Sequence, residues 1–261
     1  MNFDVKNCYN YLMITVNKDK IEDFVSLTRL RNLPFILEII AGVFLAVNFN
    51  LRTLDADKLI FVLLSFQMLY AAIYVNNDIL DWKEDLKDEI KSKRPIPSGR
   101  IKRWEALIFS LSLTVIALLL AIIFVPYLAN FELAFLFFNI FYTLVLKKIP
   151  YLEFFGIGTA HAARLYMGVS LFGGIQNYYL IYGFFVFAIL RSFFQKYKEI
   201  ENKQARRTLS FYSLRQIKLT QLFILSTLLL IILFTNSSAR IIAIIIFLYA
   251  LTLVLGYYGS G

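Results

Sequence analysis

The chain has 261 residues, of which 59% are hydrophobic and 17% are charged, and its formal net charge is +9. Soluble domains carry about a quarter charged residues, whereas the apolar residues here form long uninterrupted blocks. The single cysteine, Cys8, and the single histidine, His161, exclude an internal disulfide, a cysteine-based metal site and a histidine-rich zinc site.

The first 28 residues mix charges with short apolar runs, which predicts an amphipathic segment at the membrane interface. Apolar blocks follow, each close to the roughly 20 residues that a helix needs to cross the hydrocarbon core. Backbone polar groups in lipid must be satisfied internally, so such blocks predict helices. The eight expected spans are residues 33–49, 59–76, 105–126, 128–146, 151–174, 178–195, 219–235 and 240–257. We therefore expect an all-α, polytopic transmembrane helical bundle that forms a single domain over residues 1–261.

Lysine and arginine are distributed unevenly between the two ends of these spans. Eight alternating crossings place nearly all of them on one side, and leave only Arg52, Lys58 and Arg240 on the other. The positive-inside rule puts the basic side in the cytoplasm, together with both termini and the long loops 81–104 and 196–218. The same bias explains the positive net charge without a nucleic-acid partner.

The second span ends in an acidic run, Asn77-Asp78-x-x-Asp81-x-x-x-Asp85. If the helix continues, the three carboxylates lie at i, i+3 and i+7 on one face and repel one another unless a cation lies between them. Mg²⁺ prefers oxygen ligands and commonly bridges carboxylates to substrate phosphates. Asn77 can add a neutral oxygen or a hydrogen bond to a diphosphate.

The alternative for this run is a solvated helix end, in which Asp81 and Asp85 pair with Lys87 or Lys91. Asp78, however, follows the apolar run so closely that it lies at or below the membrane surface. Ionisable residues at that depth are costly, which favours a functional site.

A basic turn follows the acidic run closely, with the sequence Lys93-Arg94-Pro95-Ile96-Pro97-Ser98-Gly99. Its charged side chains suit phosphate binding, and equally fit an ordinary cytoplasmic loop. Together the two motifs resemble the first signature of the UbiA superfamily of intramembrane prenyltransferases. The resemblance implies a UbiA-type bundle, usually of nine spans, with catalytic carboxylates that bind Mg²⁺. The residues that it links to the metal are Asp78, Asp81 and Asp85, and those that it links to substrate are Asn77, Lys93 and Arg94.

The loop after the sixth span departs from the superfamily pattern, because it lacks a second cluster of the form Asp-x-x-x-Asp. The stretch from Gln195 to Arg207 contains no Asp, and Glu199 has Lys203 at i+4, where a second carboxylate is expected. Lys and Arg suit phosphate oxygens better than a second metal ion. Phosphoribosyl pyrophosphate, which carries a diphosphate and a separate phosphate, fits such an asymmetric site.

Four further matches resemble one branch of the superfamily, the decaprenyl-phosphate phosphoribosyltransferases. They are Lys196-Tyr197-x-Glu199, Arg206-x-x-Leu209-x-x-Tyr212, Tyr142 with Leu146-Lys147, and Arg164 in the middle of the fifth span. The branch resemblance implies substrate contacts from Tyr142, Lys147, Arg164, Lys196, Tyr197, Glu199 and Arg206. Each has a plainer alternative: Lys147 as a flanking charge, Tyr197 as an interfacial aromatic, and Arg164 as part of a polar interior with His161.

The predicted function is Mg²⁺-dependent transfer of a phosphoribosyl group from phosphoribosyl pyrophosphate to a polyprenyl phosphate lipid, at the cytoplasmic face of the membrane. The branch resemblance implies that the product is a cell-wall precursor. The alternative is prenyl transfer from an allylic diphosphate to an aromatic or other polar acceptor, with Glu199 and Glu201 as a diverged second acidic cluster. A third possibility is a transporter or scaffold whose charged loops only set topology.

Overall fold

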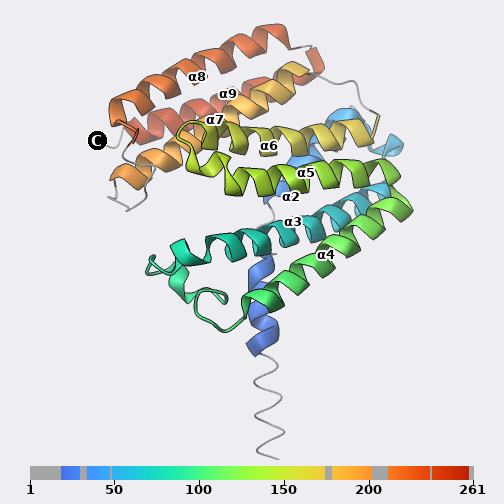
Figure 1. Ribbon diagram of the computed structural model, residues 1–261. Coiled ribbons are helices and arrows are strands. Elements are labelled where there is room, and N and C mark those ends of the chain that lie inside the picture. The colour runs from blue at the N-terminus through green and yellow to red at the C-terminus, as the bar shows by residue number, and fades with distance from the viewer. Residues whose placement is uncertain are drawn as a thin grey trace, which may run out of the picture. The chain divides into compact units, whose positions relative to one another are not determined.

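The structure is a computed structural model of the chain. It describes residues 19–29, 34–47, 49–173, 178–201, 211–235 and 237–258. These residues are helical apart from short turns and 3-10 segments, and none of them lies in a strand. The α-helices are a first segment over residues 19–28, then α2 (Pro34–Ala46), α3 (Ala56–Asp85), α4 (Arg103–Phe124), α5 (Pro126–Leu144), α6 (Leu152–Leu171), α7 (Tyr178–Glu201), α8 (Leu214–Phe234) and α9 (Ser237–Tyr258) (Figure 1). The 3-10 segments are η1 (Leu51–Thr53), η2 (Lys91–Lys93) and η3 (Leu146–Lys148).

Each apolar block in the sequence falls on one of the helices α2 to α9, which confirms the all-α prediction. Within the described residues, five stretches are long and apolar enough to cross a membrane, and they lie in α3, α4, α5 with η3, α7 and α8. Shorter apolar helices cover Ile36–Ala46 and Ala243–Val254. The exact number of spans stays a prediction. Helix α6 is not among these stretches, and it carries the polar side chains Glu153, His161 and Arg164.

The chain forms two compact units: the first consists of Met1–Leu33 and Asp57–Ile140, and the second of Pro34–Ala56 and Phe141–Gly261. In the first unit α3, which is 30 residues long, packs along α4. Ser65 Oγ on α3 lies 2.7 Å from the Ala117 carbonyl oxygen on α4 and 2.7 Å from Glu132 Oε1 on α5. The buried hydroxyl thereby joins three helices.

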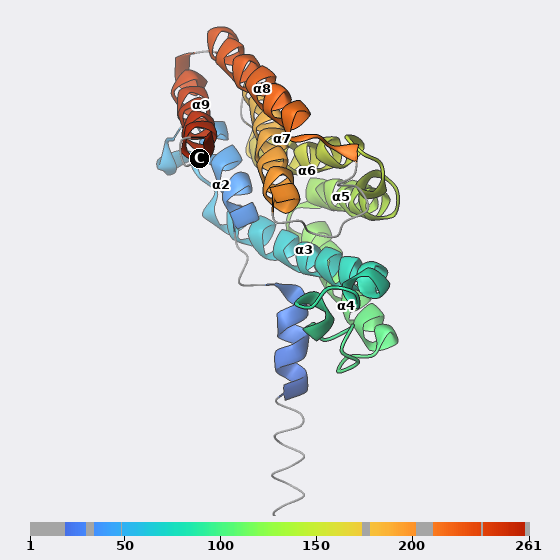
Figure 2. The ribbon, with the colours of Figure 1, turned by 90° about the vertical axis from the view of Figure 1, so that its left-hand side faces the viewer.

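In the second unit α2 packs directly on α6, backbone against backbone. A Cβ atom on Gly42 would lie 2.2 Å from the Leu165 carbonyl oxygen, and one on Gly168 would lie 2.2 Å from the Ile39 carbonyl oxygen. Small residues of this kind let membrane helices approach closely, and dispersion then holds them together. Helices α7, α8 and α9 lie alongside one another (Figure 2) and share a cluster of buried apolar side chains.

We predict that Gly42→Ala destabilises the protein, because its methyl group has no space between α2 and α6. Overpacking of this kind costs about 1 to 3 kcal/mol, and it should lower the thermal unfolding midpoint in detergent. Gly183→Ala in α7 is the matched control, because its Cβ would meet Ile231 at an ordinary 3.4 Å. Alanine also stabilises a helix by about 1 kcal/mol relative to glycine, so the control Gly183→Ala should not lower the midpoint. Equal midpoints for the two variants would contradict the packing described.

Candidate active site

The acidic run lies on the last turns of α3, and the helix continues through it as the sequence predicts. Asp78 and Asp85 are each only 4% exposed. The same nitrogen atom, Arg94 Nη1, lies 3.3 Å from Asp78 Oδ1 and 2.8 Å from Asp85 Oδ2. Two carboxylates that are seven residues apart on the helix therefore converge on one cationic atom.

Two further cations contact the same carboxylates. Arg29 Nη2 donates to Asp78 Oδ1 at 2.5 Å, and its guanidinium lies 4.7 Å from the centre of the Tyr74 ring. Lys91 Nζ lies 3.7 Å from Asp85 Oδ1, so one pairing of the alternative interpretation is present beside the Arg94 contact. Burying a carboxylate costs several kcal/mol, in order of magnitude, unless it is paired. The three cations offset that cost.

The turn after α3 fixes Arg94 in this position. Ile96 and Ile101 are buried against Val75 of α3, and the Ile101 amide donates to the Pro95 carbonyl oxygen at 3.0 Å. Gly99 completes the turn with a φ of +80°, a conformation that side chains disfavour. The apolar residues between the charged ones thus anchor the turn to the side of α3.

The other predicted residues of this region lie on the last turns of α3 and in η2. Asp81 and Asn77 are half-buried, and Lys93 is exposed. At 3.6 residues per turn, Asp81 projects about 60° away from Asp78 around α3. Within the described ranges, no three His, Cys, Asp or Glu side chains gather as a metal-binding group. The convergent pair is therefore Asp78 and Asp85, rather than all three aspartates.

The convergent pair fits a divalent cation. Mg²⁺ typically takes one or two carboxylates together with substrate phosphates and water. Asp78 and Asp85 already direct one oxygen each at a single positively charged atom. Their geometry can therefore hold one cation between them.

In the second unit Arg164 is 2% exposed and lies between α2 and α6. Its Nε donates to Glu38 Oε2 at 2.5 Å, and its Nη2 lies 2.9 Å from His161 Nδ1. His161 Nδ1 is in turn 2.5 Å from Glu38 Oε1. The shared polar interior that the sequence offered as an alternative is present, and Glu38 balances the arginine charge.

Lys196 belongs to a separate buried cluster at the start of α6. Its Nζ donates to Glu153 Oε2 at 3.1 Å, and the Tyr212 hydroxyl donates to Glu153 Oε1 at 2.7 Å. The Tyr151 amide donates to the same hydroxyl at 2.8 Å. Burial raises the pKa of Tyr212, so its hydroxyl stays protonated and remains a donor. The cluster joins the ends of α6 and α7 to the segment before α8.

The remaining predicted residues of this unit lie in several places. The Tyr142 ring packs against Gly156, and Lys147 lies in η3. Tyr197 is buried, with Lys218 Nζ 5.8 Å from its ring centre. Glu199 lies in α7 but its side chain is not described, and Arg206 falls outside the described residues.

Two of the predicted phosphate-binding residues, Lys196 and Arg164, belong to different clusters. Lys196 contacts Glu153, which precedes Arg164 by eleven residues on α6. At 1.5 Å per residue this separation is about 16 Å along the helix. The two cations are buried and each is paired with a carboxylate of another helix, so they act first as links between helices.

Sequence reasoning missed Arg29, Glu38 and Glu153. The two glutamates stand inside apolar blocks, and an intramembrane arginine such as Arg164 requires a partner. That requirement could have identified Glu38. No comparable signal marks Arg29, because it lies in a stretch with many charges.

We predict that Tyr212→Phe lowers stability by about 1 to 2 kcal/mol, because Glu153 loses a buried hydrogen bond and the Tyr151 amide loses a partly buried one. The thermal unfolding midpoint in detergent measures the loss. Tyr127→Phe, at a site that is 84% exposed, is the control. A Tyr212→Phe midpoint as high as that of the control would show that the buried hydroxyl contributes nothing.

Comparison with known proteins places these sites in a family context. The family model described as "UbiA prenyltransferase family" matches residues 35–260. The digeranylgeranylglyceryl phosphate synthase of Methanosarcina barkeri (strain Fusaro / DSM 804) is 33% identical over 136 residues, which are 49% of this chain and 47% of that protein. The match thus spans about half the length of this relative.

Solved structures show the same fold. A structure of digeranylgeranylglyceryl phosphate synthase has a TM-score of 0.66 and 23% identity, and the alignment covers 91% of this chain and 88% of that one. A UbiA homologue from Archaeoglobus fulgidus bound to DMAPP and Mg²⁺ has a TM-score of 0.71 and 18% identity, with 88% and 85% covered. The expected UbiA-type fold is confirmed. Neither protein is named for phosphoribosyl transfer, so the narrower branch assignment gains no support.

Proposed function

The chain belongs to the UbiA prenyltransferase family, and we propose that it transfers a prenyl group from an allylic diphosphate to a phosphate-bearing glyceryl acceptor, with Mg²⁺ as cofactor. The observation that carries the proposal is the convergence of Asp78 and Asp85 on one cationic atom at the end of α3. Prenyl transfer, the alternative in the sequence analysis, thereby takes precedence over phosphoribosyl transfer.

In this proposal Asp78 and Asp85 hold the metal, with Asp81 beside them. When bound, Mg²⁺ neutralises charge on the diphosphate and so stabilises it as a leaving group. Arg94 then exchanges partners: its guanidinium leaves the two carboxylates and binds diphosphate oxygens, which its planar fork fits. Asn77 and Lys93 supply further hydrogen bonds to the same group.

The acceptor class rests on two observations. The curated relative is named for a glyceryl phosphate product. The stretch from Gln195 to Arg207 carries Lys and Arg where most of the superfamily has a second acidic cluster. Positively charged side chains can bind a phosphate group on the acceptor. Lys147 and Arg206 are the candidates for this phosphate. In this proposal the basic loops 81–104 and 196–218 lie on the cytoplasmic side of the membrane, as the positive-inside rule predicts.

Phosphoribosyl transfer from phosphoribosyl pyrophosphate to a polyprenyl phosphate is the weaker candidate. This function requires Arg164 and Lys196 to bind phosphate oxygens, whereas Arg164 is paired with Glu38 and Lys196 with Glu153. Withdrawing Lys196 would leave the buried Glu153 carboxylate without its ion pair, which is strongly destabilising. Withdrawing Arg164 would break the ion pair that links α2 to α6. A phosphate-bearing acceptor accounts for the basic loop without these two residues.

We predict that Asp78→Asn and Asp85→Asn each lower the rate of prenyl transfer about 100-fold or more, since each removes a charge that holds the leaving group. Purified protein is incubated with Mg²⁺, geranylgeranyl diphosphate and a prenylated glyceryl phosphate, and the product is followed by mass spectrometry. EDTA should abolish the product. Asp57→Asn, an exposed carboxylate at the other end of α3, is the matched control.

Other outcomes point to the other functions. A labelled lipid formed only from phosphoribosyl pyrophosphate and a polyprenyl phosphate would replace prenyl transfer with phosphoribosyl transfer. No Mg²⁺-dependent product from either pair of substrates would favour a transporter or scaffold.

A further inference from the structure

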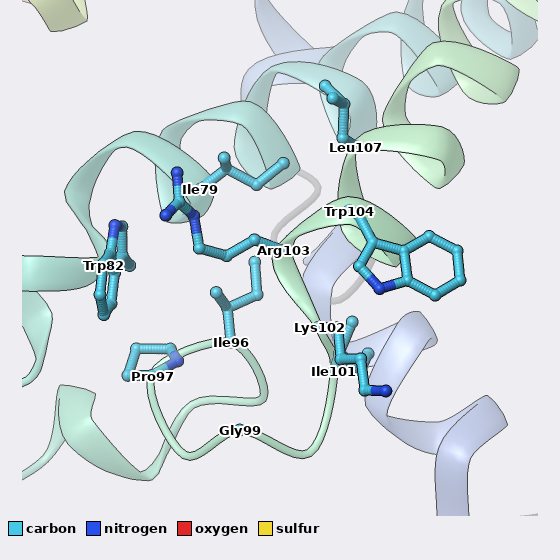
Figure 3. Close-up of a pocket in the computed structure, with 10 residues that line it drawn as sticks. All are labelled: Ile79, Trp82, Ile96, Pro97, Gly99, Ile101, Lys102, Arg103, Trp104 and Leu107. Atoms are coloured by element: carbon cyan, nitrogen blue, oxygen red, sulfur yellow. The ribbon is translucent and has the colours of Figure 1, made fainter.

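A pocket of about 730 Å³ lies in the first unit beside the turn that carries Arg94 (Figure 3). Its walls come from α3, from the turn and from the start of α4. The residues used below are Ile79, Trp82, Ile96, Lys102, Arg103 and Trp104. None of the residues assigned to the diphosphate lines it.

The pocket adjoins the carboxylates on α3, because Trp82, which lines it, follows Asp78 by four residues and lies only about 40° from it around the helix. At 3.6 residues per turn, Ile79 is about 100° around the helix from Asp78. The turn lies between the two: Arg94 reaches the carboxylates, while Ile96 lines the pocket. An occupant of the pocket would therefore contact the segment that positions Arg94, without entering the site of the reaction.

The pocket combines cations with tryptophans where α4 begins. Arg103, the first residue of α4, places its guanidinium 5.0 Å from the centre of the Trp82 ring. Trp104 is 58% exposed, and Lys102 is exposed. Tryptophan concentrates at membrane–water interfaces, where its ring is partly in lipid and partly wet. The pocket thus has the composition of the headgroup level of a bilayer.

Charge at the pocket is positive. Among the described residues, two cations and no carboxylate line it. Glu105, in the first turn of α4, is paired with Lys20 at 2.8 Å and accepts from the Lys102 amide at 3.0 Å. Within the described part of the chain, the side chains of Lys102 and Arg103 take part in no ion pair. Basic pockets at the cytoplasmic side of membrane helices attract anionic lipid headgroups.

An apolar surface continues from the pocket along α4. Leu107 lines the pocket and is 47% exposed, and beyond it Leu111 and Val115 are 56% and 55% exposed. A free phosphate ion would contact only the basic rim and leave these apolar walls unused. A molecule with a phosphate group and an attached hydrocarbon chain matches both parts.

We propose that this pocket binds one anionic phospholipid, whose phosphate contacts Lys102 and Arg103 and whose chain follows Leu107 along α4. The lipid packs against the turn at Ile96 and supports the position of Arg94. The binding itself does not depend on the proposed function. Its test therefore uses neither Mg²⁺ nor prenyl substrate.

The test uses intrinsic fluorescence, because the chain has two tryptophans, Trp82 and Trp104, and both line the pocket. The protein is reconstituted in bilayers that contain phosphatidylglycerol or phosphatidylcholine with brominated acyl chains, which quench nearby tryptophan. Quenching by brominated phosphatidylglycerol should reach half its maximum at a lower mole fraction than quenching by brominated phosphatidylcholine. The expected preference is about fivefold for each cation that contacts the phosphate.

In each of the variants Lys102→Gln and Arg103→Gln, the preference for phosphatidylglycerol should fall about fivefold. Lys87→Gln, which removes an exposed charge outside the pocket, should retain the full preference. The Lys102 side chain is exposed, so Lys102→Gln is expected to fold normally. If Arg103→Gln misfolds, Lys102→Gln alone still tests the proposal. Equal quenching by the two lipids, or a preference that survives both pocket variants, would overturn the proposal. Competition by millimolar inorganic phosphate would instead identify a site for the free ion, which also overturns it.

Discussion

The pairing of Asp78 and Asp85 with Arg94 is the constraint on which the first unit depends. Two carboxylates at the end of a long apolar helix cannot stay ionised and buried without cations. The turn after α3 supplies one cation at a fixed place, because Ile96 and Ile101 are anchored against the helix. A second comes from Arg29, and Lys91 contributes a longer contact. The order of apolar and charged residues in this stretch follows from that need.

The second unit solves the same problem in a different way. Glu38 with Arg164, and Glu153 with Lys196, are buried pairs between helices that also have further hydrogen bonds. In both, the carboxylate and its cation are contributed by different helices, so separating the helices would expose the charges to lipid. Such pairs specify which helices pack together. The Asp78–Asp85 pair differs because two acids lie on one helix and share a cation from a turn, and we propose that this cation is exchanged for Mg²⁺.

Much of this was accessible from the sequence. The apolar blocks located α2 to α9, because a chain in lipid has few ways other than a helix to satisfy its backbone. The spacing from Asp78 to Asp85 and the basic turn after it identified the family. Contacts between distant segments were not accessible: nothing local to Arg29, Glu38 or Glu153 states which partner each one meets.

The branch prediction failed to gain support for a related reason. It interpreted each basic residue of the second unit as a group available to substrate, whereas burial and pairing decide that availability. Lys196 and Arg164 look alike in sequence to Lys147, yet both are buried against carboxylates. Local motifs therefore identified the family correctly, and long-range ion pairs limited the inference about the substrate.

The central claim is that Arg94 occupies the position of an exchangeable cation between Asp78 and Asp85. Titration with Mn²⁺, followed by electron paramagnetic resonance, measures it directly in the wild-type protein and in Arg94→Gln without substrate. The account predicts that the variant binds Mn²⁺ more tightly, because the guanidinium no longer competes for the carboxylates. Binding that is unchanged or weaker in Arg94→Gln would contradict it.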